Sequence, residues 1–487
     1  MTTSEISARD DAEGRSRTRL WVATTYFAEG YPYSIVNNLA EVTFASLGAS
    51  LGAVGMTSLF HLPWNLKFLW APFVDAYGTK RRWLLAIELA LTVLLTLAGL
   101  FTTPSTLGLL AAVFFVLAVL SATHDVAIDG FYLDSLGEAD QSRYVGLRQL
   151  AYKLANLLVR GPAVVLAGLV GFRLGMLALA ALMGVVTSVH AALLPRDEPP
   201  RRPFGDLARL AWRPPVLAAV LLLGGSLAAW RALDLGARLA RTPLGRVPLE
   251  GVLALGLGVG LVVLARGCRS ERTDESPYRA AFSGFLSQPR AGVILAFVLL
   301  FRTGESFLQK MKWPFLRDGV RLSLEHYGVA NGTFGVAASF AGTILGGYLI
   351  ARHGLRRWIW PFVVAQNGLH LLYVLLARWA AEGPVDLATV TAIISIEHVG
   401  EGLGTAVFTV FLMRCCDPEH RAAHMAIVTA LMSVGFTVAG MASGYLAQAL
   451  GFVRYFAFTF FVTLPSMALI VVLPYLDGRP LNRAGAR

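Results

Sequence analysis

Two pairs of carboxylates at helical spacing are the residues whose types most clearly predict chemistry. Asp125 and Asp129 are four residues apart, and Glu397 and Glu401 repeat that spacing far along the chain. On a helix, residues four apart share one face, so each pair would present its carboxylates together. A poorly hydrated cavity favours the protonated form of a carboxylate, which lets it take up and release protons. The spacing predicts proton coupling; the alternative is that these acids only neutralise a nearby Arg or a helix end.

Further charged residues stand in otherwise apolar sequence. Glu29 lies in a stretch broken by glycine and proline, which predicts either a binding site or a kink in which Glu29 pairs with a base. Lys153 and Arg160 are seven apart and would share a helix face. Together with Arg302 and Lys310 they would attract an anionic substrate, since Arg pairs with carboxylates through two hydrogen bonds. The alternative is that these cations only neutralise the acids.

Aromatic residues, histidines and a few charges near the turns complete the predicted site. The aromatic rings could stack on a substrate or only pack, and Lys67 is more typical of a gate or of a side chain reaching the headgroups. We predict substrate contact for Tyr31, Trp64, Trp313, His124 and His398, and gating for Lys67, Asp75 and Arg81. His124 and Asp129 also form a His-x-x-x-x-Asp string typical of acyltransferases. On a helix these two residues would point about 140° apart, which disfavours a catalytic pair.

The composition indicates that these residues are positioned by membrane helices. Of 487 residues, 55% are hydrophobic and only 15% are charged, and the mean hydropathy is +0.59. So little charge could not cover so much apolar surface in water. The net charge of +11 suits cytoplasmic loops that face anionic headgroups, so we expect membrane lipid and no nucleic acid as a partner. The three cysteines have no metal spacing, and we expect neither a metal nor a cofactor.

Apolar stretches of membrane-spanning length predict an all-α membrane protein with fourteen transmembrane helices. Six lie in the first part of the chain, at 21–46, 52–74, 83–102, 107–135, 145–169 and 172–194. Two more lie in the middle, at 215–232 and 249–267, where an Arg-rich loop leaves open whether they cross fully. Six further helices are predicted at 291–315, 326–351, 357–378, 387–414, 421–449 and 452–475.

This pattern predicts two bundles joined by a linker, with both termini cytoplasmic because the basic turns fall on their side. The predicted parts are a tail (1–20), a six-helix bundle (21–194), a linker with the two extra helices (195–290), a second six-helix bundle (291–475) and a second tail (476–487).

The two bundles resemble each other. A glycine-marked turn followed by basic residues comes after the second helix of each, at 71–82 and at 346–357. The fourth helices also correspond, with Ser-Ala-Thr-His at 121–124 and Ser-Ile-Glu-His at 395–398. Parallel six-helix repeats of this kind resemble the major facilitator fold, which would hold substrate at mid-membrane between the halves.

Three strings in this order and spacing resemble the AmpG-type muropeptide permeases, relatives of acetyl-CoA transporters among the major facilitators. They are Lys-Phe-Leu-Trp-Ala-Pro-Phe-Val-Asp at 67–75, His-Asp-Val-Ala-Ile-Asp at 124–129 extending to Asp134, and Gly-Leu-Gly-Thr-Ala-Val-Phe at 402–408. The resemblance covers residues 21–475 and places Asp125 where that family carries a functionally important acid. This chain has His124, His398 and Glu401 where the family pattern has Gln, Asn and Gly.

The resemblance implies a permease rather than an enzyme: a proton symporter that imports anhydro-muropeptides, or a related polar anionic metabolite, by alternating access. It also implies the bacterial inner membrane, and we expect a monomer. A major facilitator exporter of drugs or metabolites is the alternative, and would favour an acid-lined aromatic cavity without Lys153 and Arg302. A membrane-embedded acyl- or glycosyltransferase is a more distant alternative.

Overall fold

The computed structural model describes residues 3–67, 70–196, 201–206, 284–417 and 421–477. All regular structure in this part of the chain is helical, apart from one isolated bridge between Tyr77 and Arg202. The predicted helices at 215–232 and 249–267 lie outside the described residues. The count of fourteen therefore stays a prediction.

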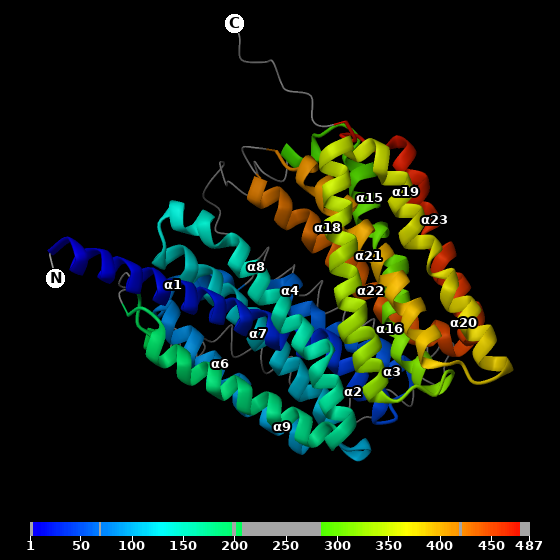
Figure 1. The fold of residues 1–487 in the computed structure, drawn as a ribbon, viewed down its shortest axis with the longest axis horizontal. Helices are drawn as coiled ribbons and strands as arrows, with labels where there is room; N and C mark the ends of the chain where they lie inside the picture. The colour runs from blue at the N-terminus through cyan, green and yellow to red at the C-terminus, as the bar shows by residue number, and fades with distance from the viewer. Residues whose placement is uncertain (1–2, 68–69, 197–200, 207–283, 418–420, 478–487) are drawn as a thin grey trace, which may run out of the picture.

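The first half of the chain forms an N-terminal bundle (Figure 1). Its elements are α1 (Thr3–Ser34), η1 (Ile35–Leu39), α2 (Ala40–Ser46), α3 (Leu51–Met56), η2 (Thr57–His61), α4 (Leu62–Leu66), α5 (Ala71–Ala76), α6 (Lys80–Leu100), η4 (Pro104–Thr106), α7 (Leu107–Ser135), α8 (Glu138–Arg160) and α9 (Pro162–Leu193). The π-helical turn η1 joins α1 to α2 without a break, and the 3-10 turn η2 joins α3 to α4. Short irregular turns inside a helix are frequent at functional sites.

The second half forms a C-terminal bundle. Its elements are α15 (Ala291–Phe301), α16 (Thr303–Asp318), α17 (Leu324–Tyr327), η6 (Gly328–Gly335), α18 (Val336–His353), α19 (Leu355–Gly368), α20 (Leu371–Glu382), α21 (Leu387–Cys415), α22 (Arg421–Phe461), α23 (Leu464–Leu469) and η7 (Ile470–Val472). η6 is again π-helical, so both bundles carry an irregular turn within a long helix. Asp386 is the N-cap of α21 and accepts hydrogen bonds from the backbone N–H and the hydroxyl of Thr389. These hydrogen bonds hold the pKa of the Asp386 carboxyl below its ordinary value.

Seven helical stretches in the described residues are long and apolar enough to cross a membrane. Two of them, 143–193 and 427–472, contain a kink at a glycine with positive φ, Gly171 and Gly451. Each kink divides its stretch where the sequence predicts two helices. The segments α1–α2, α3–α5 and α21 are not among the seven.

The corresponding turns of the two bundles share a backbone feature. Gly78, after the second helical segment of the first bundle, has φ 64°, and Gly354, at the matching place in the second bundle, has φ 86°. Only glycine adopts such φ values without strain. The glycine-marked turns that the sequence predicts are therefore confirmed in both halves.

The two bundles meet at one end and diverge toward the end that carries both termini (Figure 1). At the joined end, α22 packs on α3 and η2, and α17 and η6 pack on α9. The buried apolar clusters have the same distribution. One cluster draws residues from both bundles, whereas two others lie entirely within 285–476 or within 21–194. The molecule is thus a V that opens on the side of the termini.

Candidate functional site

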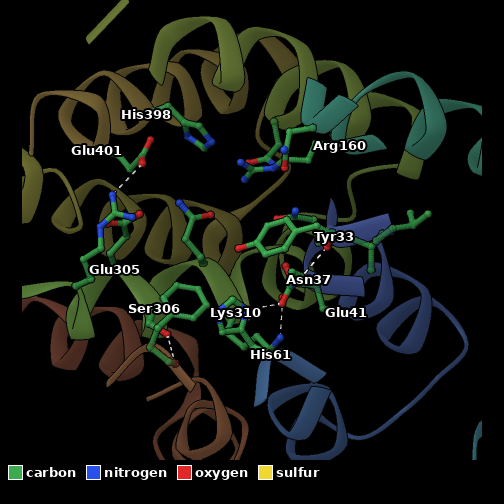
Figure 2. A pocket seen from close by; sticks show the side chains of 18 of the residues that line it. Tyr33, Asn37, Glu41, His61, Arg160, Glu305, Ser306, Lys310, His398 and Glu401 are labelled. Carbon is green, nitrogen blue, oxygen red and sulfur yellow. Dashed lines mark hydrogen bonds and ion pairs between the residues drawn. The ribbon is translucent and has the colours of Figure 1, made fainter. Parts of the chain in front are cut away.

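A cavity of about 290 Å³ lies between the bundles (Figure 2). Helices α1, α2, α8, α9, α16, α17, α21 and α22 and the turns η1, η2 and η6 contribute to its wall. The lining residues with polar or charged side chains are Tyr33, Asn37, Asn38, Glu41, His61, Asn156, Arg160, Arg302, Glu305, Ser306, Gln309, Lys310, Tyr327, Asn331, His398, Glu401 and Ser433. So many polar groups at mid-bundle are costly unless they face a hydrated or ligand-filled space.

On the wall formed by the C-terminal bundle, Arg302 holds two carboxylates. Its guanidinium lies 3.5 Å from Glu305 Oε2 and 3.4 Å from Glu401 Oε1, and it also donates to the Thr405 hydroxyl. Ser339 donates a hydrogen bond to the other oxygen of Glu401. Since one cation faces two acids, this group has room for one proton.

A second ion pair joins the two bundles across the cavity. Lys310 Nζ on α16 lies 3.0 Å from Glu41 Oε2 on α2, and both side chains are largely buried. Nearby, the Trp313 indole donates to Ser46 Oγ at 3.1 Å, again from one bundle to the other. Both contacts hold the joined end together, and the Lys310–Glu41 pair also lines the cavity.

Arg160 is the cavity cation without an acidic partner. It forms no hydrogen bond or ion pair within the described part of the chain, and its charge acts on Glu41, which is paired with Lys310. Figure 2 shows its side chain extending into the cavity across from Glu401 and His398. Arg160 therefore places a positive charge on the wall formed by the N-terminal bundle, opposite the acids held by Arg302.

Neutral polar groups fill the rest of the wall. His61 Nδ1 lies 2.8 Å from Asn37 Oδ1, and the His61 ring stacks on Trp64 with centroids 5.8 Å apart. Among the neutral lining residues of the C-terminal bundle, three buried side-chain atoms have no hydrogen-bond partner in the described part of the chain: Asn331 Oδ1, His398 Nε2 and Ser433 Oγ. Buried polar atoms are normally satisfied, so these three indicate that a ligand or water belongs here.

A group of acids and bases lies in the N-terminal bundle, outside the cavity lining. Asp125 forms an ion pair with Lys67 and interacts electrostatically with Glu29, whose Oε2 is buried without a hydrogen-bond partner among the described residues. Asp129 pairs instead with Arg148 at 3.0 Å and accepts from the Tyr26 hydroxyl at 2.9 Å. Two neighbouring carboxylates favour sharing a proton, so this arrangement beside a base is compatible with the predicted proton-coupling role, which stays a prediction.

A matching group lies on the fourth helical segment of the second bundle. Glu397 binds Lys312 at 2.6 Å, His398 Nδ1 at 2.9 Å and the Tyr373 hydroxyl at 3.4 Å. Lys312 is completely buried, so this ion pair is protected from water. Lys312 therefore neutralises the single carboxylate of Glu397, whereas Lys67 faces the two carboxylates of Asp125 and Glu29.

The structure brings together five of the residues predicted for the site and places others elsewhere. Arg160, Arg302, Lys310, His398 and Glu401 line the cavity. Lys153 is exposed and lies over the Phe340 ring at 4.7 Å, Tyr31 donates to the Leu179 carbonyl in the core, and His124 faces Glu88 inside its own bundle. Trp64 and Trp313 pack behind the lining residues.

The predicted gating residues lie on the side of the termini or beside Asp125. Asp75 pairs with Lys80, and Arg81 donates to the Ala191 carbonyl at 2.7 Å. Arg201, which follows α9, pairs with Asp134 and also donates to the Asp75 carbonyl. Gating itself stays a prediction for these residues.

Sequence reasoning missed Glu41, Glu305 and the buried Glu88–His190 pair. Glu41 and Glu305 each lie inside a predicted membrane helix. An acid in that position is costly and marks a candidate functional residue, so the sequence did contain a signal for both. Within the described residues, no group of three or more His, Cys, Asp or Glu side chains is arranged to hold a metal ion.

Paired helical bundles around a charged cavity define the class of the protein, a membrane transporter. The chain matches the Major Facilitator Superfamily profile over residues 22–301 and 291–486, and it belongs to that family. It is 25% identical to the anhydromuropeptide permease of Escherichia coli strain K12, over 92% of this chain and 77% of the permease.

Solved structures show the same fold at lower identity. A POT family transporter in complex with 5-aminolevulinic acid matches with a TM-score of 0.63 and 15% identity, over 94% of this chain and 96% of that one. A bacterial homologue of the human lysosomal transporter Spinster, in an inward-facing and unoccupied conformation, matches with a TM-score of 0.64 and 13% identity, over the same shares. The major facilitator family and fold predicted from the sequence are confirmed, whereas the count of fourteen helices stays a prediction.

Proposed function

We propose that this protein imports anhydro-muropeptides, or closely related sugar–peptide metabolites, across the bacterial inner membrane by proton symport. The similarity to the E. coli permease over most of both chains supports the substrate class. The cavity supports a polar substrate with an anionic group, because Arg160, Arg302 and Lys310 all face it. Glu41, Glu305 and Glu401 line the same cavity, but they pair with Lys310 and Arg302 and leave Arg160 without an ion pair among the described residues, which favours an anionic substrate over a lipophilic cation.

The observation that best supports proton coupling is the group formed by Asp125, Lys67 and Glu29. When Asp125 is ionised, Lys67 neutralises it. When a proton binds to the Asp125–Glu29 pair, the attraction between Asp125 and Lys67 weakens and Lys67 is released. Because Lys67 lies on the second helical segment and Asp125 on α7, protonation changes how these two helices are held together.

The V shape supports a direction for the cycle. If the termini are cytoplasmic, as the basic turns predict, the described conformation is open to the cytoplasm and closed on the outside at the joined end. Substrate and proton would then leave from this state. Lys310–Glu41 and the α3–α22 contact would separate when the protein reopens outward.

The test is uptake of labelled anhydro-muropeptide into proteoliposomes with and without an inward acid gradient. A gradient of about one pH unit supplies about 1.4 kcal/mol per proton, which accumulates substrate about tenfold at one proton per substrate. We expect this accumulation in the wild type and its loss in Asp125→Asn, with counterflow exchange retained. Asp140→Asn is the matched control, because Asp140 makes only a long, exposed contact with Arg143.

Accumulation by Asp125→Asn equal to that of the wild type would overturn the assignment of the proton to Asp125. No uptake by folded wild-type protein would reject the muropeptide as substrate.

A further inference from the structure

The charges around the cavity are distributed unevenly between the two bundles. On the wall of the C-terminal bundle, Glu305 and Glu401 share Arg302, so this wall holds one carboxylate more than its cation neutralises. Lys310 is neutralised by Glu41 across the cavity. Arg160 is left on the opposite wall, where it forms no ion pair with a described residue; the acid that its charge acts on, Glu41, is already paired with Lys310. If the Glu305–Glu401 pair takes up one proton, Arg302 balances the remaining carboxylate. The cavity then has a net charge of one positive unit, which is located on Arg160.

Backbone packing fixes the position of Arg160. It is the last residue of α8, and Gly161 after it leaves the helical conformation at φ −107° and ψ −88°. The Arg160 carbonyl contacts Gly332 of η6 so closely that a Cβ added at Gly332 would lie 1.9 Å from the oxygen. The Arg160 backbone therefore belongs to the contact between bundles, while the side chain reaches the cavity.

Unsatisfied neutral groups of the other bundle face the same cavity. Asn331 is the residue before Gly332, and its Oδ1 is buried without a partner, as are His398 Nε2 and Ser433 Oγ. A ligand held by Arg160 would thus also meet neutral hydrogen-bonding groups of the C-terminal bundle, which can bind its uncharged parts.

We propose that Arg160 is the anion-binding residue of the cavity and that it selects substrates carrying a carboxylate; this inference rests on the proposed transport function. The guanidinium binds a carboxylate through two parallel hydrogen bonds. A phosphate carries about −1.5 to −2 charges at neutral pH, more than one Arg neutralises, whereas a carboxylate matches it. The neutral groups around Asn331 then bind the uncharged sugar or amide part. Substrate held in this way contacts both bundles.

The experiment compares two labelled probes that differ in one charge, GlcNAc-anhydroMurNAc with its lactyl carboxylate and the same disaccharide as the carboxamide. Uptake into proteoliposomes is measured at subsaturating concentration for wild type, Arg160→Gln, Arg160→Lys and Arg173→Gln. Arg173 is an exposed control on α9. A charge-assisted hydrogen bond contributes about 1.5–3 kcal/mol, so we expect the wild type to prefer the acid by about tenfold or more.

We expect the ratio of acid to carboxamide uptake to fall to about one in Arg160→Gln, to be intermediate in Arg160→Lys, and to stay unchanged in Arg173→Gln. An undiminished ratio in Arg160→Gln, or no preference in the wild type, would overturn the proposal.

A binding measurement separates this proposal from the transport proposal. The melting temperature of the purified protein is recorded with N-acetylmuramic acid and with its amide. A stabilisation by the acid alone that Arg160→Gln abolishes supports the carboxylate site even if muropeptide uptake fails. Equal shifts with acid and amide overturn it, whatever the uptake result.

Discussion

At the scale of single residues, a buried cluster in the N-terminal bundle explains how Asp125 is oriented. Oε1 of Glu88 on α6 lies 3.2 Å from His124 Nε2 on α7 and 2.6 Å from His190 Nδ1 on α9, and all three side chains are fully buried. One imidazolium would neutralise the carboxylate. Because His124 is fixed on this side of α7, the adjacent Asp125 points about 100° further around the helix, toward Lys67.

We predict that Glu88→Gln destabilises the protein by about 3 kcal/mol, because it removes the acid from a buried ion pair and leaves the histidines without a counter-charge. Thermal unfolding in detergent, followed by intrinsic fluorescence, measures the change. Glu382→Gln is the control, since Glu382 is exposed at the end of α20. Equal melting temperatures for the two variants would contradict the structural role of this cluster.

At the scale of elements, glycines let the helices of the two bundles approach at backbone distance. A Cβ at Gly444 of α22 would lie 1.8 Å from the Leu51 carbonyl of α3, and one at Gly440 would lie 2.1 Å from Ser58 Oγ. Small residues have this role in membrane helices, where close van der Waals packing replaces the hydrophobic effect. The joined end of the molecule therefore depends on residues without side chains.

We predict that Gly444→Ala opens the joined end and lowers transport severalfold or more, because the added methyl group has no space beside Leu51. The reporter is labelling of a Ser46→Cys cysteine, in a background without the native cysteines, by a membrane-impermeant maleimide applied from the side opposite the termini. Labelling should become severalfold faster. Gly347→Ala is the matched control, since a Cβ there meets nothing within 4 Å. Unchanged labelling would show that the α3–α22 contact tolerates the methyl group.

At the scale of the whole molecule, polar contacts between the bundles join the two halves near the cavity. Lys310 and Glu41 belong to different bundles, as do Trp313 and Ser46. The apolar cluster shared by both bundles surrounds this region, whereas the clusters at the open end are separate. A movement of one bundle against the other must therefore break the Lys310–Glu41 ion pair while leaving each bundle intact.

We predict that Lys310→Gln and Glu41→Gln each lower uptake by about tenfold or more, because either change leaves a buried charge without its partner. The exchanged pair Glu41→Lys with Lys310→Glu should recover part of the activity, since it restores opposite charges at the same distance. The loss and recovery of activity are measured as proteoliposome uptake of the three variants, each first checked for monodispersity. Additive losses in the exchanged pair would argue against a direct functional ion pair.

Several helices could be predicted closely from the sequence. α7 begins at Leu107 and ends at Ser135, as predicted, and α21 ends one residue beyond its predicted end. A long run of apolar residues can be recognised in the local sequence. In a membrane such a run must satisfy its own backbone hydrogen bonds, so its length predicts where the helix begins and ends. The site was less predictable. Asp125 and Asp129 share a helix, yet they bind different bases, Lys67 and Arg148.

The sequence by itself determined the membrane class, the two similar halves, the glycine turns and the residue types available for binding anions and protons. Only the tertiary structure decided that Glu41 meets Lys310, that Lys153 lies outside the cavity lining and that Arg160 faces the cavity without an acidic partner in the described residues. The physical reason is that a helix is specified by neighbours a few residues apart. A charge, in contrast, is neutralised by whichever group the packing of two separate bundles brings within about 4 Å.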